Sequence, residues 1–464
     1  MAYPRLILAL GCGLLTTGCF NPDGPSANET EGSTGATPTT GPQLTTAGGP
    51  TGNDTVEVDT TASTPDGTTS DGTSGGESSS TGGPTPCTDA GDCSDGLLCI
   101  DDSCQPCSAA ADPDGECEAR SGDAPVCDAD AGLCVACVAE TCDGMTPVCD
   151  PAVGCAACTV HADCPDSACH LMGPEQGGCF DVADVEEVSD ITELEAALTI
   201  GAGSQLVINL TAETFTVGGT FSVNGEVAIL GQPGTVITGG ATNLFAFGGD
   251  GQYLYVADVA VDTGPFRAFN CSGAGGLWLD DTVVDGYALG VYSGCETHLR
   301  RGRYVSTDDT GAAVEMLAGG ELFAENVAFG PGGEVPIRLT DATADLRYVT
   351  IAGNALSLIC MGGASGTIRN SILVSPTGGS ITPGCQLSFV DNAVDGGFGF
   401  GDDVGVYDPA WFVSPAVGDF HLTPAGQATF GGIADWDDGD PLLDVDGDPR
   451  PQDRAGFPGI DEVP

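Results

Sequence analysis

Apolar residues recur at a regular spacing along the C-terminal half of the chain. Pairs five positions apart mark short strands between Gly, Asp and Asn turns: Val256/Val261, Leu279/Val284, Leu299/Tyr304, Ala324/Phe329, Leu346/Ile351 and Ile368/Leu373. The steps between first members are 23, 20, 25, 22 and 22 residues. A β-type repeat of this length is typical of a solenoid, in which each coil buries its apolar face against its neighbours. We therefore predict an all-β fold, a parallel β-helix with about 22 residues per coil over residues 181–402.

Charged residues test this register independently. The position after the first marker is occupied by Ala257, Asp280, Arg300, Glu325, Arg347, Arg369 and, one further step of 22 residues on, Asp391. Parallel strands lie about 4.8 Å apart, so opposite charges in this column would meet. Four of the five steps between its charged members join opposite charges. The next column contains Asp258, Asp281, Arg301, Asn326, Tyr348, Asn370 and Asn392, and its asparagines suit a turn stacked from coil to coil.

Two cysteine pairs have the same period. Cys271 and Cys295 are 24 residues apart, and Cys360 and Cys385 are 25 apart. Each pair could form a disulfide between adjacent coils, within the distance limits on such bridges. Before the strands, Asp190 precedes a helix-start pattern that places Ile191, Leu194 and Leu198 on one face, which predicts one short amphipathic helix.

Residues 87–180 are rich in cysteine and form an internal repeat. The groups are Cys87, Cys93, Cys99, Cys104; Cys107, Cys117, Cys127, Cys134; Cys137, Cys142, Cys149, Cys155; and Cys158, Cys164, Cys169, Cys179. We interpret them as four disulfide-stapled modules without large cores, each with three possible connectivities. The Cys-x-x-Cys pairs Cys104/Cys107, Cys134/Cys137 and Cys155/Cys158 could instead bind zinc or act in redox chemistry, but each pair joins two repeats. We expect His161 and His170 to be solvent-exposed loop residues.

The N-terminus predicts export. Arg5 precedes a ten-residue apolar run that is too short to span a bilayer and has the length of a signal-peptide core. Leu15-Thr16-Thr17-Gly18-Cys19 resembles a bacterial lipobox, which implies a signal peptide over residues 1–19 and a lipid anchor on Cys19. The alternative is an ordinary cleaved signal with Cys19 unmodified. No aspartate follows the cysteine, so we expect placement in the outer membrane, facing the cell exterior. Residues 20–86 are dominated by Thr, Ser, Gly and Pro and predict a disordered linker.

Charge excludes one class of partner. The 464 residues include 11 Lys plus Arg against 67 Asp plus Glu, a formal net charge of -56. Such a chain repels phosphate backbones, so we expect no nucleic-acid partner.

The C-terminal 280 residues resemble a known superfamily. Ile191–Leu198, Leu206–Leu210 and Thr214–Val217 are similar to the capping helix and opening strands of the right-handed parallel β-helix, pectin-lyase-like superfamily. Asp408–Phe412, Gly418–Leu422 and Asp444–Pro451 resemble the tail of bacterial choice-of-anchor Q proteins, which implies that residues 403–464 pack on the β-helix. The ending Gly459–Glu462 departs from that family's usual Asp-x-Gly-Ala-x-Glu.

Some members of the superfamily cleave acidic polysaccharides, which directs attention to acidic and basic clusters. Asp280/Asp281 or Asp308/Asp309 could act as an acid and base pair. Polygalacturonases use Gly-His-Gly and Arg-Ile-Lys motifs that this chain lacks. Pectate lyases use Ca²⁺-binding aspartates with an arginine base, for which the candidates are Arg300, Arg301 and Arg303 near Asp281. The alternative for these residues is a ladder of structural ion pairs.

Asp444, Asp446 and Asp448 have alternate-residue spacing that could present oxygens to Ca²⁺. Pro449 replaces the glycine of an EF-hand, so no EF-hand is present. The alternative is an acidic turn in which Arg450 pairs locally. We predict no obligatory cofactor, with Ca²⁺ as a possible one.

These features favour a non-catalytic surface lipoprotein whose β-helix binds a glycan or another surface polymer. A Ca²⁺-assisted polysaccharide lyase or hydrolase around Asp281 and Arg301 is the alternative, and a structural spacer is a third. A groove holding Asp281 and Arg301 together would favour the enzyme.

Overall fold

The computed structural model describes residues 85–463, except 89–91, 94–96, 122–123, 139–140, 151–152, 201–202, 240–242, 265, 287–290, 307–310, 333–334, 380, 383 and 397–398. The predicted signal peptide, Cys19, the linker except its last two residues, and the pair Asp308/Asp309 lie outside the described residues. Within the described part, no helix combines the length and the apolar character needed to cross a membrane.

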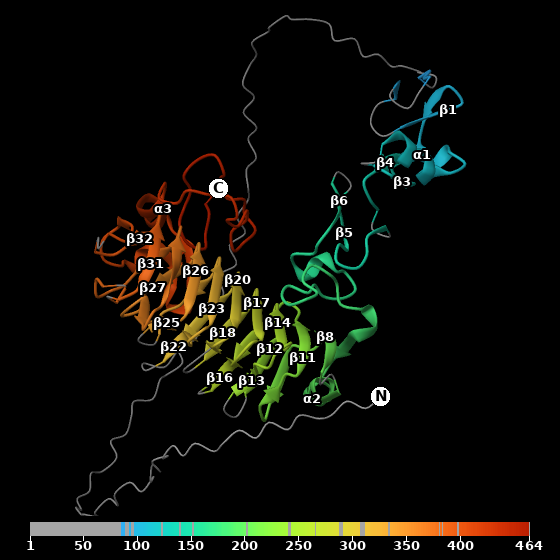
Figure 1. Cartoon of the computed structure of the whole chain (residues 1–464). Helices are drawn as coiled ribbons and strands as arrows, with labels where there is room; N and C mark the ends of the chain where they lie inside the picture. Colours follow the sequence, from blue (N-terminus) through green and yellow to red (C-terminus); the bar gives the residue numbers. More distant parts are fainter. Residues whose placement is uncertain are drawn as a thin grey trace, which may run out of the picture. The chain divides into compact units, whose positions relative to one another are not determined.

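The predicted parallel β-solenoid is confirmed, with about nine turns. Three parallel sheets run along it, and consecutive strands of each sheet come from consecutive coils (Figure 1). Sheet 1 contains β7 (Val185–Val188), β8 (Ser204–Leu210), β11 (Gly225–Leu230), β14 (Tyr253–Ala257), β17 (Gly276–Asp280), β20 (Glu296–Arg300), β23 (Glu321–Glu325), β26 (Thr343–Arg347), β29 (Ser365–Arg369) and β31 (Gln386–Val390).

Sheet 2 contains β9 (Thr214–Val217), β12 (Val236–Gly239), β15 (Ala260–Asp262), β18 (Val283–Gly286), β21 (Arg303–Ser306), β24 (Ala328–Phe329), β27 (Thr350–Ala352), β30 (Ile372–Val374), β32 (Ala393–Val394) and β33 (Asp402–Asp403). Sheet 3 contains β10 (Phe221–Ser222), β13 (Asn243–Phe247), β16 (Arg267–Cys271), β19 (Val291–Ser293), β22 (Ala312–Met316), β25 (Val335–Thr340) and β28 (Leu358–Met361). Each coil therefore has up to three strands, and alternate apolar residues along these strands point into a shared interior.

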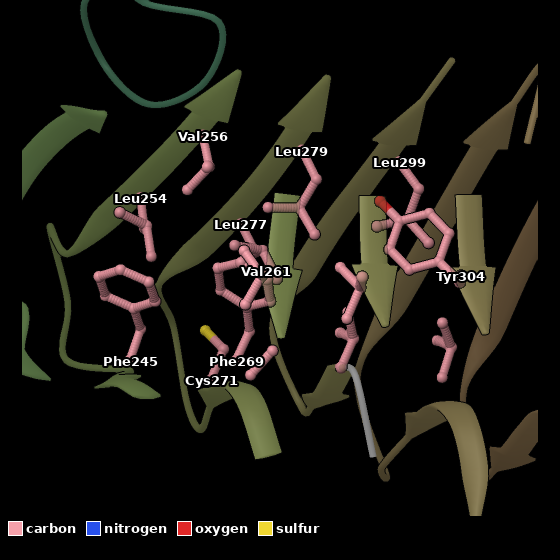
Figure 2. Packing of buried hydrophobic residues seen from close by; sticks show 14 of the residues in the cluster. Phe245, Leu254, Val256, Val261, Phe269, Cys271, Leu277, Leu279, Leu299 and Tyr304 are labelled. Carbon is pink, nitrogen blue, oxygen red and sulfur yellow. The ribbon is translucent and has the colours of Figure 1, made fainter. Parts of the chain in front are cut away.

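The register matches the five-residue pairs. Val256 pairs with Leu279, which pairs with Leu299, and the match continues to Ile368. The second members, from Val261 to Leu373, align in sheet 2. Figure 2 shows the first of these side chains, Val256, Val261, Leu279, Leu299 and Tyr304, directed into the interior of the coils. Phe245 and Phe269 lie there too, and their rings stack at a centroid distance of 5.5 Å. The interior is therefore built from side-chain columns that repeat from coil to coil.

The turn between sheets 1 and 2 is a column of left-handed residues. Asp258, Asp281, Arg301, Asn326, Tyr348, Asn370 and Asp391 all have φ between 46° and 57°. Asparagine and aspartate tolerate this region better than other non-glycine residues, which explains why they are frequent in this column. Arg301 and Tyr348 lack that advantage and are held in the same conformation by the coils on either side.

Two details of the predicted columns are wrong. The last step is 21 residues, because Arg369 pairs with Val390 and not with Asp391. Asp391 therefore takes the turn position, and Asn392 follows it with a buried amide that donates to Ile368 O (2.9 Å) and accepts from Ser371 N (2.9 Å). The charge ladder is also shorter than expected. Arg300 pairs with Asp280 (3.9 Å) and Glu325 (3.6 Å), whereas Arg347 pairs within its own strand with Asp345.

Helix α2 (Ile191–Ile200) confirms the predicted amphipathic helix. Asp190 Oδ1 accepts hydrogen bonds from the N–H groups of Thr192 and Glu193 at its start, at 2.8 and 2.9 Å. Leu194 and Leu198 are buried in the interior cluster of the solenoid, so the helix covers the first coil. Two disulfides, Cys271–Cys295 and Cys360–Cys385, join adjacent coils with Cα–Cα distances of 5.9 and 5.1 Å.

The cysteine-rich modules share one connectivity. In every module the first cysteine bonds to the third and the second to the fourth: Cys87–Cys99, Cys93–Cys104, Cys107–Cys127, Cys117–Cys134, Cys137–Cys149, Cys142–Cys155, Cys158–Cys169 and Cys164–Cys179. In the first three modules the third and fourth cysteines lie opposite each other in an antiparallel hairpin. These hairpins are β1/β2 (Leu98–Ile100, Ser103–Gln105), β3/β4 (Val126–Asp128, Leu133–Val135) and β5/β6 (Val148–Asp150, Gly154–Ala156). Helix α1 (Pro113–Arg120) lies in the second module.

The fourth module, residues 158–180, packs on the outer face of sheet 1. Leu171 and Phe180 are buried in one apolar cluster with Ala228 and Tyr255 of that sheet. The expectation that His161 and His170 are exposed is wrong, since both are buried in this contact. His170 Nδ1 hydrogen-bonds Glu226 Oε1 (2.7 Å), and its ring stacks on Phe180. The module is thus docked by apolar and polar contacts together.

The tail packs against sheet 2. It contains a short 3-10 helix η6 (Pro409–Trp411), β34 (Phe412–Ser414), β35 (Asp419–Leu422) and α3 (Pro424–Phe430). Trp411, Phe420 and Phe430 form an apolar cluster with Ile372 and Val374 of the sheet.

Arg450 ties the tail to the turn column. It is buried, donates to Asn326 Oδ1 (2.7 Å) and lies 3.8 Å from the centre of the Tyr348 ring. Its guanidinium also lies 3.8 Å from the Glu462 carboxylate. Arg450 therefore fixes the position of the tail relative to two coils.

Candidate functional site

A groove at the turn column brings two of the predicted catalytic candidates, Asp281 and Arg301, together with the tail. This charged groove has a volume of about 430 Å³. Its lining includes Asp281, Arg301, Arg303, Asp419, His421 and Asp446. The sequence register places Asp281 and Arg301 on adjacent coils, and the groove holds them together. The tail residues that complete it lie outside the coil repeat, so the repeat does not link them to these two residues.

Most charged side chains of the groove form ion pairs. Arg301 donates to both oxygens of Asp280, at 3.0 and 2.9 Å, and its guanidinium lies 2.9 Å from Asp281. Asp280 is only 3% exposed, so its carboxylate faces the arginine and not the solvent. Arg303 donates to the backbone oxygen of Val417 (2.7 Å). Asp280 and Arg301 thus form a structural pair at the wall of the groove.

The pKa of Asp281 and the pKa of Arg301 are both raised. Burial raises the pKa of Asp281 to about 6; Arg301 opposes this shift, and the carboxylates of Asp280 and Asp258 add to it. Burial lowers the pKa of Arg301, but the hydrogen bond to Asp280 and the charges of the three carboxylates raise it by more, so it lies above its usual value. A lyase base must lose its proton, and this arginine holds its proton firmly.

The Asp444/Asp446/Asp448 segment forms a turn. Asp444 Oδ1 accepts hydrogen bonds from the N–H groups of Asp446 (2.9 Å) and Asp448 (2.8 Å), and its Oδ2 accepts one from Glu462 N (2.9 Å). Backbone donors thus engage both oxygens of this buried carboxylate. The Asp446 side chain points elsewhere, since its Oδ2 lies 2.7 Å from His421 Nε2. The three aspartates therefore do not converge as the set that their spacing suggested.

A second groove lies beside the fourth cysteine module on the outer face of sheet 1. This aromatic groove has a volume of about 310 Å³ and is lined in part by Trp278, His298, Phe323, Arg300 and Glu325. The three rings occupy successive coils in one register column, and they stack with centroid distances of 4.4 and 4.6 Å. Thr159 and Gln176 of the cysteine module complete the wall.

The aromatic groove combines apolar rings with polar groups. Trp278 is 9% exposed, and no described residue accepts a hydrogen bond from its Nε1. The Arg300 guanidinium lies 5.7 Å from the centre of the Trp278 ring, and His298 Nε2 hydrogen-bonds Glu296 (2.8 Å). This groove was not predicted from the sequence, although the sequence contains a pattern that indicates it. Aromatic residues occupy the position before the first apolar marker in four consecutive coils, from Tyr255 to Phe323.

Comparison with known proteins adds one match. Residues 61–185 match a family of unknown function, DUF8331. The matched segment contains the four cysteine modules and ends at the first residue of β7. It includes Thr159 and Gln176 of the aromatic groove, but neither the three stacked rings of that groove nor the charged groove. No curated protein and no solved structure matches the chain.

Proposed function

We propose that this protein is a cell-surface lipoprotein that binds an uncharged glycan, or a similar hydroxyl-rich surface polymer, without cleaving it. The observation that carries the proposal is the aromatic groove, in which Trp278, His298 and Phe323 form a continuous stack beside polar side chains. Sugar rings present apolar C–H faces and hydroxyl edges. Aromatic side chains with a few polar groups at their margin suit such ligands.

Size and charge support the same ligand class. A cavity of about 310 Å³ falls at the lower end of ligand sites and suits one or two sugar rings at a time. The formal net charge of -56 disfavours the approach of anionic polysaccharides, whereas an uncharged polymer meets no such barrier. Arg300 and Glu325, which pair with each other at 3.6 Å, and the amide of Gln176 provide donors and acceptors for hydroxyl groups.

The lipobox-like segment at Cys19 and the linker that follows support attachment to an outer membrane, with the cysteine modules and the solenoid outside the cell. The resemblance to the pectin-lyase-like superfamily and to choice-of-anchor Q proteins supports a polysaccharide as the ligand. The modules would hold the binding surface away from the membrane.

A specific observation favours a second candidate, a polysaccharide lyase or hydrolase. Asp281 and Arg301 line one groove, which is the arrangement that an enzyme of this type requires. Against it stand the pairing of Arg301 with Asp280 and Asp281 and the raised pKa of this arginine. The binding function therefore has the stronger support.

The test uses the oxidised full-length protein with a panel of neutral and acidic polysaccharides, with Ca²⁺ or a chelator. Co-sedimentation measures binding, and the release of reducing ends or unsaturated ends measures cleavage. We expect binding to a neutral polysaccharide without cleavage. Phe323→Ala should weaken it by about tenfold, the equivalent of one lost ring contact.

Trp278→Phe keeps a ring in the stack and removes Nε1, so it separates hydrogen bonding from packing. Tyr292→Ala is the matched control, because this aromatic residue lies on sheet 3 under the Arg267 guanidinium. Binding that Phe323→Ala leaves unchanged would contradict the proposed site. Cleavage by the unmodified protein that is lost in Asp281→Ala would show that the protein is an enzyme and contradict the proposed non-catalytic function.

A further inference from the structure

Three side chains of the tail form a compact donor set at the edge of the charged groove. His421 lies on β35, Asp446 lies in the turn that begins at Asp444, and Asp461 lies near the C-terminus. One ligand atom from each of these residues lies within 4.8 Å of the other two. Bonds of about 2.0–2.2 Å from nitrogen and oxygen to a single ion hold the donor atoms within about 4.4 Å of one another, so the three side chains are close to the spacing that one ion requires. We propose that His421, Asp446 and Asp461 bind a divalent transition ion of the Zn²⁺ type.

The environment of Asp461 is a second, independent observation that supports a bound metal ion. It is 8% exposed, and no described cation lies within 4 Å of its carboxylate. Leu422 N donates a hydrogen bond to its Oδ2 (2.7 Å), which fixes its orientation without neutralising its charge. A buried carboxylate without a cation is costly, and a bound metal ion removes that cost.

The histidine is already oriented for a metal ion. His421 Nδ1 lies 2.6 Å from Asp419 Oδ1, on the same strand two residues earlier. A carboxylate behind one imidazole nitrogen fixes the ring and the tautomer, and it leaves the other nitrogen for the ion. That other nitrogen, Nε2, lies 2.7 Å from Asp446 Oδ2. An ion that replaces this hydrogen bond needs only a small separation of the two side chains.

The donor types and the surroundings indicate the class of ion. Ca²⁺ and Mg²⁺ bind through oxygen ligands alone, whereas imidazole with carboxylates suits Zn²⁺ and its neighbours in the first transition row. His421 and Asp446 line the charged groove of about 430 Å³. Three protein ligands at the edge of an open groove leave a coordination position for water or another ligand. The site would therefore be an open one and not a closed structural one.

The test is metal binding by the oxidised full-length protein after treatment with a chelator. The protein is titrated with ZnCl₂, and binding is measured by calorimetry and by competition with a fluorescent chelator. We expect one equivalent of Zn²⁺ to bind. His421→Ala and Asp461→Asn should each lower the affinity by about 100-fold or more. Asp419→Asn, which removes the carboxylate behind the imidazole, should lower it by about 10-fold. An excess of Ca²⁺ should not displace the Zn²⁺.

His298→Ala is the matched control, since this imidazole also pairs with a carboxylate but lies on sheet 1. Asp461→Asn keeps an oxygen that can accept the Leu422 N–H, and near-ultraviolet circular dichroism checks that each variant is folded. Three results would overturn the proposal: no bound Zn²⁺ in the unmodified protein, unchanged affinity in folded His421→Ala or Asp461→Asn, or ready displacement of Zn²⁺ by Ca²⁺. Loss of binding in His298→Ala alone would place the metal elsewhere.

Discussion

Two buried tyrosines should respond in opposite directions to the loss of the same hydroxyl group. Tyr304 belongs to the interior column of sheet 2, and no described residue forms a hydrogen bond with its Oη (Figure 2). Tyr255 lies on the outer face of sheet 1, and its Oη donates to Glu226 Oε1 (2.7 Å) or Met172 O (3.1 Å). We therefore compare Tyr304→Phe with Tyr255→Phe.

The magnitudes follow from the partners. A buried hydroxyl without a partner costs about 1–3 kcal/mol, so Tyr304→Phe should stabilise the protein by about 1 kcal/mol after the small loss of packing. The column already accepts phenylalanine, because Phe329 occupies the same position on the next coil. Tyr255→Phe removes the single hydrogen-bond donor that serves the Glu226 carboxyl group or the Met172 carbonyl group, which should cost about 1.5–3 kcal/mol. The two variants should thus differ by about 2.5–4 kcal/mol.

Equilibrium unfolding in guanidinium chloride with intact disulfides, followed by near-ultraviolet circular dichroism, measures the difference. The transition midpoint should rise in Tyr304→Phe and fall in Tyr255→Phe, with slopes equal to that of the unmodified protein. The melting temperature should shift by about 2–4 °C per kcal/mol in the same directions. The reasoning is refuted if Tyr304→Phe loses 1 kcal/mol or more, or if Tyr255→Phe is neutral.

Three further predictions concern stability. Replacing Cys271 and Cys295 together by serine opens a 24-residue loop and should cost about 3 kcal/mol, measured by chemical unfolding; an unchanged midpoint would contradict this. Asp258→Asn keeps a residue suited to φ 57° and removes a carboxyl group whose pKa is raised by burial and then by Asp280, so the melting temperature should rise and not fall. Burial lowers the pKa of His161 from 6.5 to about 4. Between these two pH values the unfolded chain binds a proton at His161 and the folded chain does not, so the free energy of unfolding decreases as the pH falls from 6.5 to about 4. His161→Gln should flatten that part of the pH–stability curve, and a curve parallel to that of the unmodified protein would exclude the effect.

The coil register was predictable because its determinants are local. Each interior pair, such as Leu279 and Val284, and each turn residue, such as Asn370, obeys a steric rule within a few positions of the chain. The predicted spacing of the last coil was wrong because both 21 and 22 residues are compatible with a strand at this point. Asp391 suits either the charge column or the turn, so only the packing of the last coil decides.

Burial of the histidines was not predictable in the same way. His170 is buried because the fourth module docks on Glu226, 56 residues further along the chain. The charged groove has the same origin: periodicity locates Asp281 and Arg301, but His421 and Asp446 belong to a tail without a repeat. The aromatic groove differs, since the column from Tyr255 to Phe323 could have been read from the register.

The interleaved disulfides have a mechanical consequence. In the first module 17 residues separate Cys87 from Cys104, which would extend to about 60 Å without cross-links. With the Cys87–Cys99 bond in place, the taut covalent path crosses 5.8 Å between their Cα atoms and then five residues, a total of about 23 Å. Covalent bonds therefore take up a pull on a module at less than half the length that the unlinked segment would reach. A load on the solenoid would lengthen each module only as far as this covalent limit.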